Sequence, residues 1–208
     1  MINTMIVEDQ RMIRSLLESY IQAEDGYRVA ISIAGAHRAI ELCKNIDLIL
    51  MDVQTEHREN GLVAAEKIKK AYPNIKIVIV TSLLDYDVLK TARAIGADSL
   101  WYKDSARNTL MDVVKRTVAG EHIFPDSPPA VEIGTAKSSE FTKTELKVLK
   151  YIVKGLSYGK IAEAMGIEVT TVKYHVTNML QKTSLENKLQ LALAVSDAKL
   201  IANISEDE

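Results

Sequence analysis

The sequence predicts an α/β domain, a doubly wound parallel sheet of five strands, followed by a four-helix all-α domain. In the first 120 residues short apolar runs alternate with amphipathic stretches; a proline-rich segment then breaks this pattern, and only helical patterns follow it. With 208 residues, the chain is long enough for two domains. We expect the α/β domain over residues 1–120, a linker over 121–137 and the helical domain over 138–208.

Five short runs of β-branched and other apolar residues have the length and composition of strands. They are Asn3–Val7, Tyr27–Ile31, Leu48–Met51, Ile75–Val80 and Ser99–Tyr102. The runs are continuously apolar, which is typical of parallel strands that are covered on both faces.

Amphipathic stretches follow these runs and predict five helices. They are Met12–Ala23, Ala36–Cys43, Leu62–Ala71, Asp85–Ile95 and Thr109–Ala119. In the first of them, Ile13, Leu16, Leu17 and Tyr20 recur at helical spacing, which predicts one buried stripe. Alternating strands and helices imply a parallel sheet with helices on both faces.

The segment between the two domains is rich in turn-forming residues. It contains Pro125, Pro128, Pro129 and Gly134, and this composition is typical of a linker. Four helical patterns follow, over Phe141–Val153, Ser157–Met165, Glu168–Gln181 and Asn187–Ala198. The first begins at the pattern Thr142-x-x-Glu145, a capping box that marks a helix N-terminus.

Composition excludes several classes of protein. No apolar run approaches the roughly 18 residues that a membrane span needs, and Glu8 and Asp9 interrupt the N-terminal apolar stretch. We therefore expect a cytoplasmic protein with no membrane partner. The single cysteine, Cys43, cannot form an intramolecular disulfide, and the four histidines lie too far apart in sequence to suggest a zinc site.

The net charge of −2 conceals an uneven distribution. Residues 1–120 contain 16 basic and 16 acidic side chains, whereas residues 137–182 contain eight Lys and four Glu. Positive charge thus gathers in the helical domain, as a surface that binds phosphates requires.

Polar side chains collect where the predicted strands end. The first strand is followed by Glu8 and Asp9, the third by Asp52, the fourth by Thr81 and the fifth by Lys103. The carboxyl ends of parallel strands form the functional edge of such a sheet, so these groups should converge. Crowded carboxylates favour a hard cation such as Mg²⁺. Asp52 could then act as a nucleophile and form an acyl phosphate, whose charge Lys103 and the Thr81 hydroxyl would offset.

This set of residues, at these strand ends, resembles the receiver domain of two-component response regulators, over residues 1 to about 120. The resemblance implies a flavodoxin-like fold in which Asp52 accepts a phosphoryl group from a sensor histidine kinase. It also implies that Asp9 and Asp52 bind Mg²⁺ together with the backbone carbonyl of Gln54, with Glu8 in support.

The sequence departs from the receiver pattern beyond these residues. Thr55-Glu56 replaces a common Met-Pro, Gly61 falls nine residues after Asp52 instead of eight, and Leu100 occupies the usual place of an aromatic switch residue. Asp104 stands where many receivers have proline. These differences keep open an alternative, a DNA-binding regulator that works without phosphorylation and carries a pseudo-receiver domain.

The helical domain contains a helix-turn-helix spacing. Ala162 is small enough for two helices to cross closely, Gly166 permits a tight turn, and Val172 should point back into the core with Val169, Val176 and Met179. One face of the second helix carries neutral hydrogen-bonding groups and one cation: Thr170, Lys173, Tyr174, Thr177 and Gln181. Such a face suits a recognition helix in the major groove of double-stranded DNA.

The wider pattern from residue 138 to about 202 resembles the C-terminal domain of the NarL/LuxR family. The matching residues are Phe141, Thr142, Glu145, Val148, Leu149, Gly155, Leu156, Ser157, Ile161, Ala162, Thr171, Val172, Lys173, His175, Asn178 and Lys182. The resemblance implies that Lys173 is the main DNA-contacting residue and that Tyr174 and Thr177 face the groove. Thr171 and Lys182 would lie near phosphates, and His175 could support the fold or contact DNA. The fourth helix would form a homodimer.

We therefore expect a transcriptional regulator, and not an enzyme. A phosphatase or phosphotransferase that uses Asp52 is the rival class. Such enzymes commonly need a second carboxylate nearby, and the next-but-one residue here is Gln54.

Overall fold

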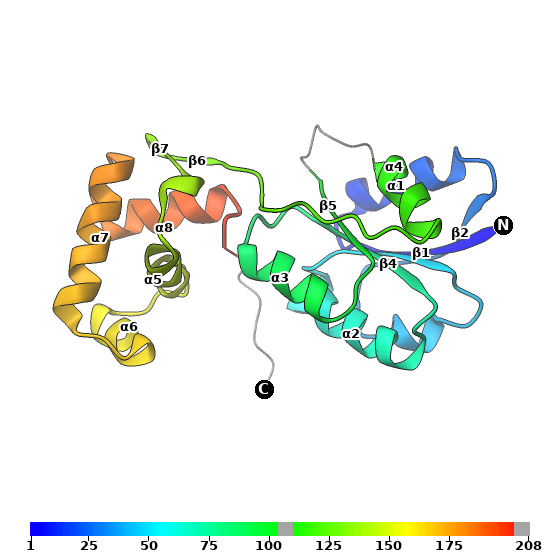
Figure 1. The fold of residues 1–208 in the computed structure, drawn as a ribbon, viewed down its shortest axis with the longest axis horizontal. Coiled ribbons are helices and arrows are strands. Elements are labelled where there is room, and N and C mark those ends of the chain that lie inside the picture. The colour runs from blue at the N-terminus through cyan, green and yellow to red at the C-terminus, as the bar shows by residue number, and fades with distance from the viewer. Residues whose placement is uncertain (104–109, 202–208) are drawn as a thin grey trace. The chain divides into compact units, whose positions relative to one another are not determined.

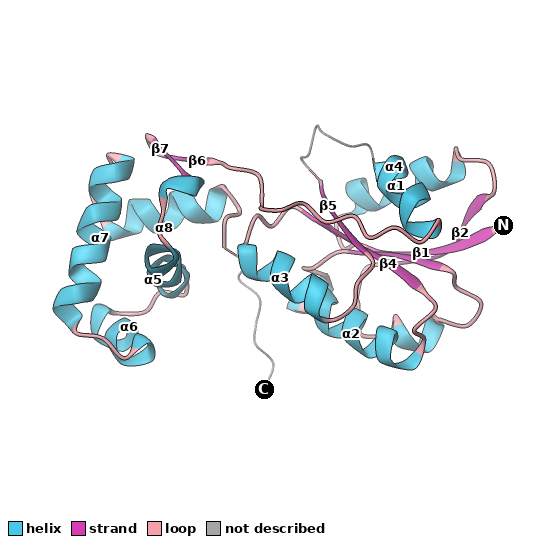
Figure 2. Cartoon of the chain, in the orientation of Figure 1, coloured by secondary structure: helices cyan, strands magenta, loops and turns pink. Residues whose placement is uncertain are grey.

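The computed structural model describes residues 1–103 and 110–201 and shows two compact units. The first consists mostly of residues up to 127, and the second mostly of residues from 128 onward. Figure 1 shows the two units as ribbons, and Figure 2 shows that one is built around a sheet and the other from helices. The predicted fold class, an α/β domain followed by an all-α domain, is confirmed.

The first unit is built on a parallel sheet of five strands in the order β2-β1-β3-β4-β5. The strands are β1 (Ile2–Val7), β2 (Tyr27–Ile33), β3 (Leu48–Met51), β4 (Lys76–Thr81) and β5 (Ser99–Tyr102). Every neighbouring pair is parallel. This order is that of a flavodoxin-like sheet, which places the ends of β1 and β3 side by side at its functional edge.

Helices cover both faces of this sheet. They are α1 (Arg11–Gln22), α2 (Gly61–Ala71), α3 (Tyr86–Ala94) and α4 (Leu110–Val118). Figure 1 shows α1 and α4 on one face and α2 and α3 on the other. The residues of α1 and α4 that face the sheet, such as Leu17, Ile21 and Val113, form one buried cluster with Leu50 and Val78. The two-sided covering explains why β3 and β4 are buried along nearly their whole length, whereas every second residue of the edge strand β2 is exposed, contrary to the continuous apolar run predicted there.

The helix predicted over Ala36–Cys43 is not formed. The chain makes successive tight turns there, and only Ile40–Leu42 is helical, as a single 3₁₀ turn. The amide of Leu42 donates to the carbonyl of Ala39, three residues back, and the amide of Glu41 donates to Arg38 in the same way. Ala36 and Ala39 are buried all the same, because a 3₁₀-type spacing also brings every third residue to one side, and Cys43 is buried as well.

The buried face of α1 also differs from the prediction. Leu17 and Ile21 are buried, whereas Leu16 is 44% exposed and Tyr20 is 42% exposed. The helix therefore turns Leu17 and Ile21 toward the sheet, and the predicted stripe was wrong for two of its four members. Periodicity alone did not distinguish these two faces, since both are apolar.

The second unit begins with a short hairpin that the prediction had placed in the linker. Strands β6 (Glu132–Ile133) and β7 (Ala136–Lys137) pair antiparallel, and Ile133 and Ala136 join the core of the helical unit. At the turn, Gly134 has a φ of 59°, and a Cβ there would lie 2.1 Å from the carbonyl oxygen of Thr183. The stretch that separates the units is thus shorter than the predicted 121–137.

Four helices complete this unit: α5 (Lys143–Val153), α6 (Tyr158–Met165), α7 (Val169–Thr183) and α8 (Lys188–Asp197). The predicted capping box is confirmed, because the Thr142 hydroxyl accepts from the amide of Glu145 and the Glu145 carboxylate accepts from the amide of Thr142. Gly166 ends α6 in the left-handed conformation, with a φ of 64°, as the turn requires.

The crossing of α6 and α7 follows the helix-turn-helix prediction with one exception. Ala162, Val172, Val176 and Met179 are buried together in the core. Val169, which was predicted to share that core, is 38% exposed because it lies in the first turn of α7. Among the residues that the structure describes, no helix is both long enough and apolar enough to cross a membrane.

Candidate functional site

The polar groups predicted to converge do meet at one edge of the sheet. Glu8 directly follows β1, Asp52 follows β3, Thr81 ends β4 and Lys103 follows β5. Glu8 and Thr81 are fully buried, Asp52 is 4% exposed and the Lys103 side chain is 7% exposed. The ends of four adjacent strands therefore bring these groups to one buried edge of the sheet, which we call the acidic pocket.

Lys103 links the carboxylates of this pocket. Its Nζ lies 2.5 Å from Oε2 of Glu8 and 2.9 Å from Oδ2 of Asp52. The other oxygen of Asp52, Oδ1, accepts a hydrogen bond of 2.7 Å from the amide of Val53. One ammonium thus balances two carboxylates from neighbouring strands.

The electrostatics of the pocket follow from its burial. Desolvation raises the pKa of Asp52 to about 7; the charge of Lys103 acts against this rise, and the charge of Glu8 adds to it. Burial also disfavours the charged form of Lys103, but Asp52 and Glu8 outweigh burial and raise the pKa of this ammonium. Asp52 is therefore a carboxylate that lacks sufficient compensating positive charge.

The donor set suits a hard divalent cation. One ligand atom each from Glu8, Asp9 and Asp52 lies within 4.8 Å of the others. Lys103 pairs with two of these carboxylates, and a bound cation with oxygen ligands would offset further negative charge at the cluster. Gln54, the fourth predicted ligand, pairs with Asn60 in an isolated antiparallel bridge, and its role remains a prediction.

The predicted DNA-reading face lies on the outside of α7. Thr170, Lys173, Tyr174 and Thr177 are all exposed, Tyr174 at 64%, while Thr171 is half-buried. Val172, Val176 and Met179 point the other way and hold the helix to its domain. The helix therefore presents one polar face that its own core does not use.

The comparisons with known proteins match each of the two domains to a family. The response regulator receiver domain family matches residues 4–115, and the luxR family of bacterial regulatory proteins matches residues 139–195. The response regulator protein VraR of Staphylococcus epidermidis is 31% identical over 207 residues, which cover 96% of this chain and 99% of VraR. VraR of Staphylococcus aureus is also 31% identical over the same shares.

The chain is a response regulator. It belongs to the two-component regulators that join a receiver domain to a DNA-binding domain of the luxR type.

Solved structures show the same fold at lower identity. The response regulator ChrA of a heme-sensing two-component system is 22% identical with a TM-score of 0.51, and the match covers 96% of this chain and 98% of ChrA. RcsB, solved as dimers bound to DNA, is 16% identical with a TM-score of 0.61, over 94% of this chain and 98% of RcsB. At these identities the likeness supports a shared fold and nothing beyond it.

In this response regulator the loop after Asp52 folds tightly back against that residue. The amide of Gly61 donates to the carbonyl of Val53 at 2.9 Å. A Cβ on Gly61 would lie 1.8 Å from the carbonyl oxygen of Asp52, so only glycine fits there. Gly61, which falls nine residues after Asp52 instead of eight, thus closes a loop that is one residue longer than in the usual receiver pattern. Leu100, in the usual place of an aromatic switch residue, is buried, and Asp104 lies outside the described residues.

Lys182 has a partner that the sequence did not predict. Its Nζ lies 2.9 and 2.8 Å from the two carboxylate oxygens of Glu145 and 3.1 Å from the carbonyl of Glu140. The pair joins the capping box of α5 to the end of α7 across 37 residues of sequence, and no local pattern signals it. A phosphate contact by Lys182 remains a prediction, and in this structure the ammonium stabilises the domain.

Helix α7 of the luxR-type domain also borders a hollow of about 470 Å³. Its lining comes from α7 and from the first turn of α5, and consists of Thr142, Glu145, Tyr174, His175, Asn178, Gln181 and Lys182. His175 lies in this lining with its ring 5.8 Å from that of Tyr174, edge to face. It is half-buried, so both roles that the sequence left open are compatible with its position.

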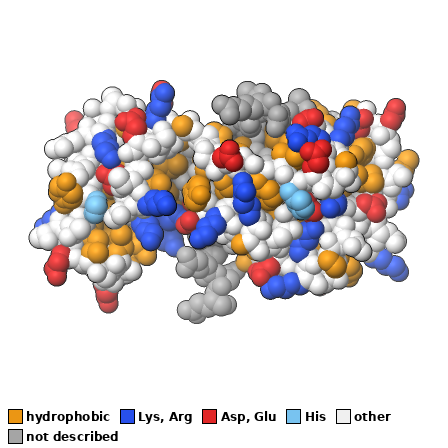
Figure 3. Space-filling view, in the orientation of Figure 1, with side chains coloured by type: hydrophobic (Ala, Val, Ile, Leu, Met, Phe, Trp, Pro, Cys, Tyr) orange, Lys and Arg blue, Asp and Glu red, His pale blue; other side chains and the backbone are white. Residues whose placement is uncertain are grey.

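Charge is distributed differently over the two domains. Acidic and basic side chains are interspersed over the face of the receiver domain seen in Figure 3, in keeping with their equal counts. The excess of lysine over residues 137–182 lies within the luxR-type domain, which is the part that needs to attract phosphates.

Proposed function

We propose that this response regulator is switched by transfer of a phosphoryl group to Asp52 from the phosphohistidine of a sensor histidine kinase. The observation that carries the proposal is the buried pocket in which Lys103 reaches both Glu8 and Asp52, beside the cluster of Glu8, Asp9 and Asp52. The ionised Asp52 carboxylate would attack phosphorus while the P–N bond breaks, and the leaving imidazole nitrogen would take a proton from water.

The residues of the pocket divide the work of this transfer. Glu8, Asp9, Asp52 and the Gln54 carbonyl would hold Mg²⁺, which when bound neutralises charge on the phosphoryl oxygens. The Lys103 ammonium, already 2.9 Å from Asp52, would pair with the incoming phosphoryl group, and the Thr81 hydroxyl would donate to it. The buried walls exclude bulk water and strengthen these interactions.

Phosphorylation would then shift the population of receiver conformations and favour a homodimer. A dimer would present two copies of α7 to half-sites about one helical turn of DNA apart. Thr170, Lys173, Tyr174 and Thr177 would face the major groove, and Thr171 would lie near phosphates. Exposed Leu189 and Leu193, one turn apart on α8, supply an apolar face for the dimer that the fourth helix is expected to form.

The switch is tested with beryllofluoride, which mimics a phosphoryl group. With Mg²⁺ and beryllofluoride the wild-type protein is expected to shift from monomer toward dimer, measured as solution mass by light scattering. Asp52→Ala should abolish the shift because the ligating carboxylate is lost. Asp25→Ala, which removes an exposed carboxylate in the turn before β2, should leave it intact.

Two outcomes would oppose the proposal. A shift that persists in Asp52→Ala would place the modified group elsewhere. A wild-type protein that gains no phosphoryl mass from acetyl phosphate and does not respond to beryllofluoride would favour the phosphorylation-independent alternative. The longer loop and the buried Leu100 are the features that favour this alternative. Turnover of small phosphate esters would instead favour the rival enzyme class.

DNA recognition is tested at Lys173. Against duplexes selected by the wild-type protein from a random pool, Lys173→Ala is expected to weaken binding roughly ten- to hundredfold, because a specific base contact contributes about 1–3 kcal/mol. Lys147→Ala removes an equally exposed lysine from α5 and serves as the matched control for charge. Fluorescence anisotropy at several salt concentrations gives both affinities, and equal losses in the two variants would contradict a reading role for Lys173.

A further inference from the structure

The segment after β2 is joined to the loop after Asp52 by four contacts, which we call the clasp. Two are hydrogen bonds donated by backbone amides. The amide of Glu56 donates to the carbonyl of Ala34 at 3.2 Å, and the amide of Ala36 donates to the Thr55 hydroxyl at 3.2 Å. Two involve Glu59, whose carboxylate accepts from the amide of His37 at 2.9 Å and lies 2.8 Å from Nδ1 of His37. Residues 34–37 and 55–59 are thereby held together.

The same loop is closed on itself next to Asp52. The amide and the hydroxyl of Thr55 both donate to the carbonyl of Glu59, at 3.1 and 3.3 Å. Gln54 bridges to Asn60, and Gly61 bonds to Val53. Gln54 therefore lies on a short closed loop, residues 52–61, which we call the strap. The strap begins at Asp52, and its residues 55–59 make the contacts of the clasp.

Thr55 is the buried centre of this arrangement. Its residue is 3% exposed, and Ala36, whose amide it accepts, is 2% exposed. A methyl group in place of the hydroxyl would remove one of the acceptors of that buried amide, which also bonds to the Glu59 carboxylate, and would loosen the contact between the two segments. The His37–Glu59 pair is more exposed and contributes less energy, but it fixes the same segment from a second point.

We propose that Thr55 and Glu59 are positioning residues for cation binding: the clasp holds the strap in the conformation that presents the Gln54 carbonyl beside the carboxylates of Glu8, Asp9 and Asp52. The inference rests on the proposed function of that pocket as a Mg²⁺ site. Groups that orient metal ligands without touching the metal commonly change its affinity by tenfold or more when they are removed. The features in which this loop departs from the receiver pattern then serve one purpose, which is to place the Gln54 carbonyl. They are the Thr55-Glu56 sequence with its buried hydroxyl and the later position of Gly61.

The test compares Thr55→Val with Thr55→Ser in the full chain. Valine has the shape of threonine but lacks the hydroxyl, whereas serine keeps it. By isothermal calorimetry with Mg²⁺, Thr55→Val is expected to weaken binding roughly tenfold and Thr55→Ser to remain close to wild type. With acetyl phosphate as donor, the Mg²⁺ concentration for half-maximal phosphoryl uptake should rise in Thr55→Val, with the maximal rate retained.

Glu59→Ala provides a second variant in case Thr55→Val does not fold, and it should also weaken Mg²⁺ binding. Folded variants with wild-type Mg²⁺ affinity and a lowered melting temperature would overturn the inference and leave Thr55 as a residue of structural importance only. Asp9→Asn separates the two proposals: if it abolishes Mg²⁺ binding while the clasp variants do not change it, only the clasp inference fails. A wild-type chain that takes up no Mg²⁺ would overturn both.

Discussion

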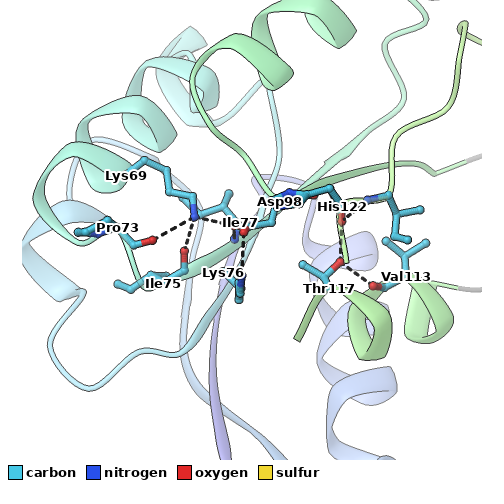
Figure 4. A network of polar contacts seen from close by, with 11 residues as sticks. Lys69, Pro73, Ile75, Lys76, Ile77, Asp98, Val113, Thr117 and His122 are labelled. Atoms are coloured by element: carbon cyan, nitrogen blue, oxygen red, sulfur yellow. Dashed lines mark hydrogen bonds and ion pairs between the residues drawn. The ribbon is translucent and has the colours of Figure 1, made fainter. Parts of the chain in front are cut away.

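Replacing Asp98 with alanine is expected to lower the free energy of unfolding of the receiver domain by about 3–5 kcal/mol. Asp98 is buried, and its carboxylate lies 2.6 Å from Nζ of Lys69 and 3.1 Å from Nζ of Lys76, and accepts from the amide of Ile77 at 2.9 Å (Figure 4). Without the carboxylate, the Lys69 ammonium, whose side chain is 12% exposed, would lose its ionic partner. Urea unfolding followed by far-ultraviolet circular dichroism measures the loss.

The Asp98 carboxylate should also make the free energy of unfolding depend on pH. Burial alone would raise the pKa of Asp98, but the bond from Lys69, the amide of Ile77 and Lys76 outweigh burial and lower it. A carboxyl group with a lowered pKa contributes stability that is fully present above its unfolded value, about 3.9, and that is lost as the pH falls through the lowered folded value. The wild-type advantage over Asp98→Asn should thus be large at pH 7 and shrink below about pH 4.

The control for both experiments is Asp112→Ala. Asp112 is half-exposed on α4 and lies 3.8 Å from Arg116, so its loss should change stability by less than about 1 kcal/mol. A stability gap between wild type and Asp98→Asn that stays constant down to pH 3 would show that the charge of Asp98 has little part in it.

The second large effect is expected at Gly61. An alanine Cβ there would lie 1.8 Å from the carbonyl oxygen of Asp52, a contact that no side-chain rotation can relieve. The strap must then open or the Asp52 backbone must move, at a cost of about 1–3 kcal/mol or more. Displacing the nucleophile by about 1 Å can reduce a reaction rate on the order of a hundredfold, so phosphoryl uptake from acetyl phosphate should fall steeply in Gly61→Ala.

Gly96→Ala is the matched control for this substitution. Gly96 also lies in the receiver domain and has a φ of 79°, but no atom comes within 4 Å of an added Cβ. It should therefore lose stability through backbone strain alone, about 1–2 kcal/mol, and keep its rate of phosphoryl uptake, which mass spectrometry follows over time. Equal rates in wild type and Gly61→Ala would mean that the strap does not position Asp52.

The sequence predicted those features that depend on local chemistry or on the topology of parallel sheets. The convergence of Glu8, Asp52 and Lys103 follows once the strands are parallel and adjacent, and the Thr142–Glu145 capping box depends on four successive residues. The course of residues 36–43 could not be predicted in this way. The amides of Ala36 and His37 bind Thr55 and Glu59, about 20 residues away, and contacts at this separation leave no signal in the local sequence pattern.

The same limit explains the remaining differences. Whether α1 buries Leu16 or Ile21 depends on which side meets the sheet, and both sides are apolar. Ile133 and Ala136 resembled linker residues because the hairpin that contains them is short and stands beside prolines. The Lys182–Glu145 pair joins elements 37 residues apart, and only the packing of α5 against α7 brings them together.

The two sides of α7 have a consequence for how such regulators diversify. Val172, Val176 and Met179 anchor the helix in the core, and Lys182 fixes its end to Glu145, so folding draws on these positions. The exposed residues Lys173, Tyr174 and Thr177 lie outside the core of the unbound domain. Substitutions at these outward positions, where we propose that DNA is read, can therefore alter operator preference while the protein keeps its thermal stability, so that duplicated genes can diverge in their promoters without loss of the fold.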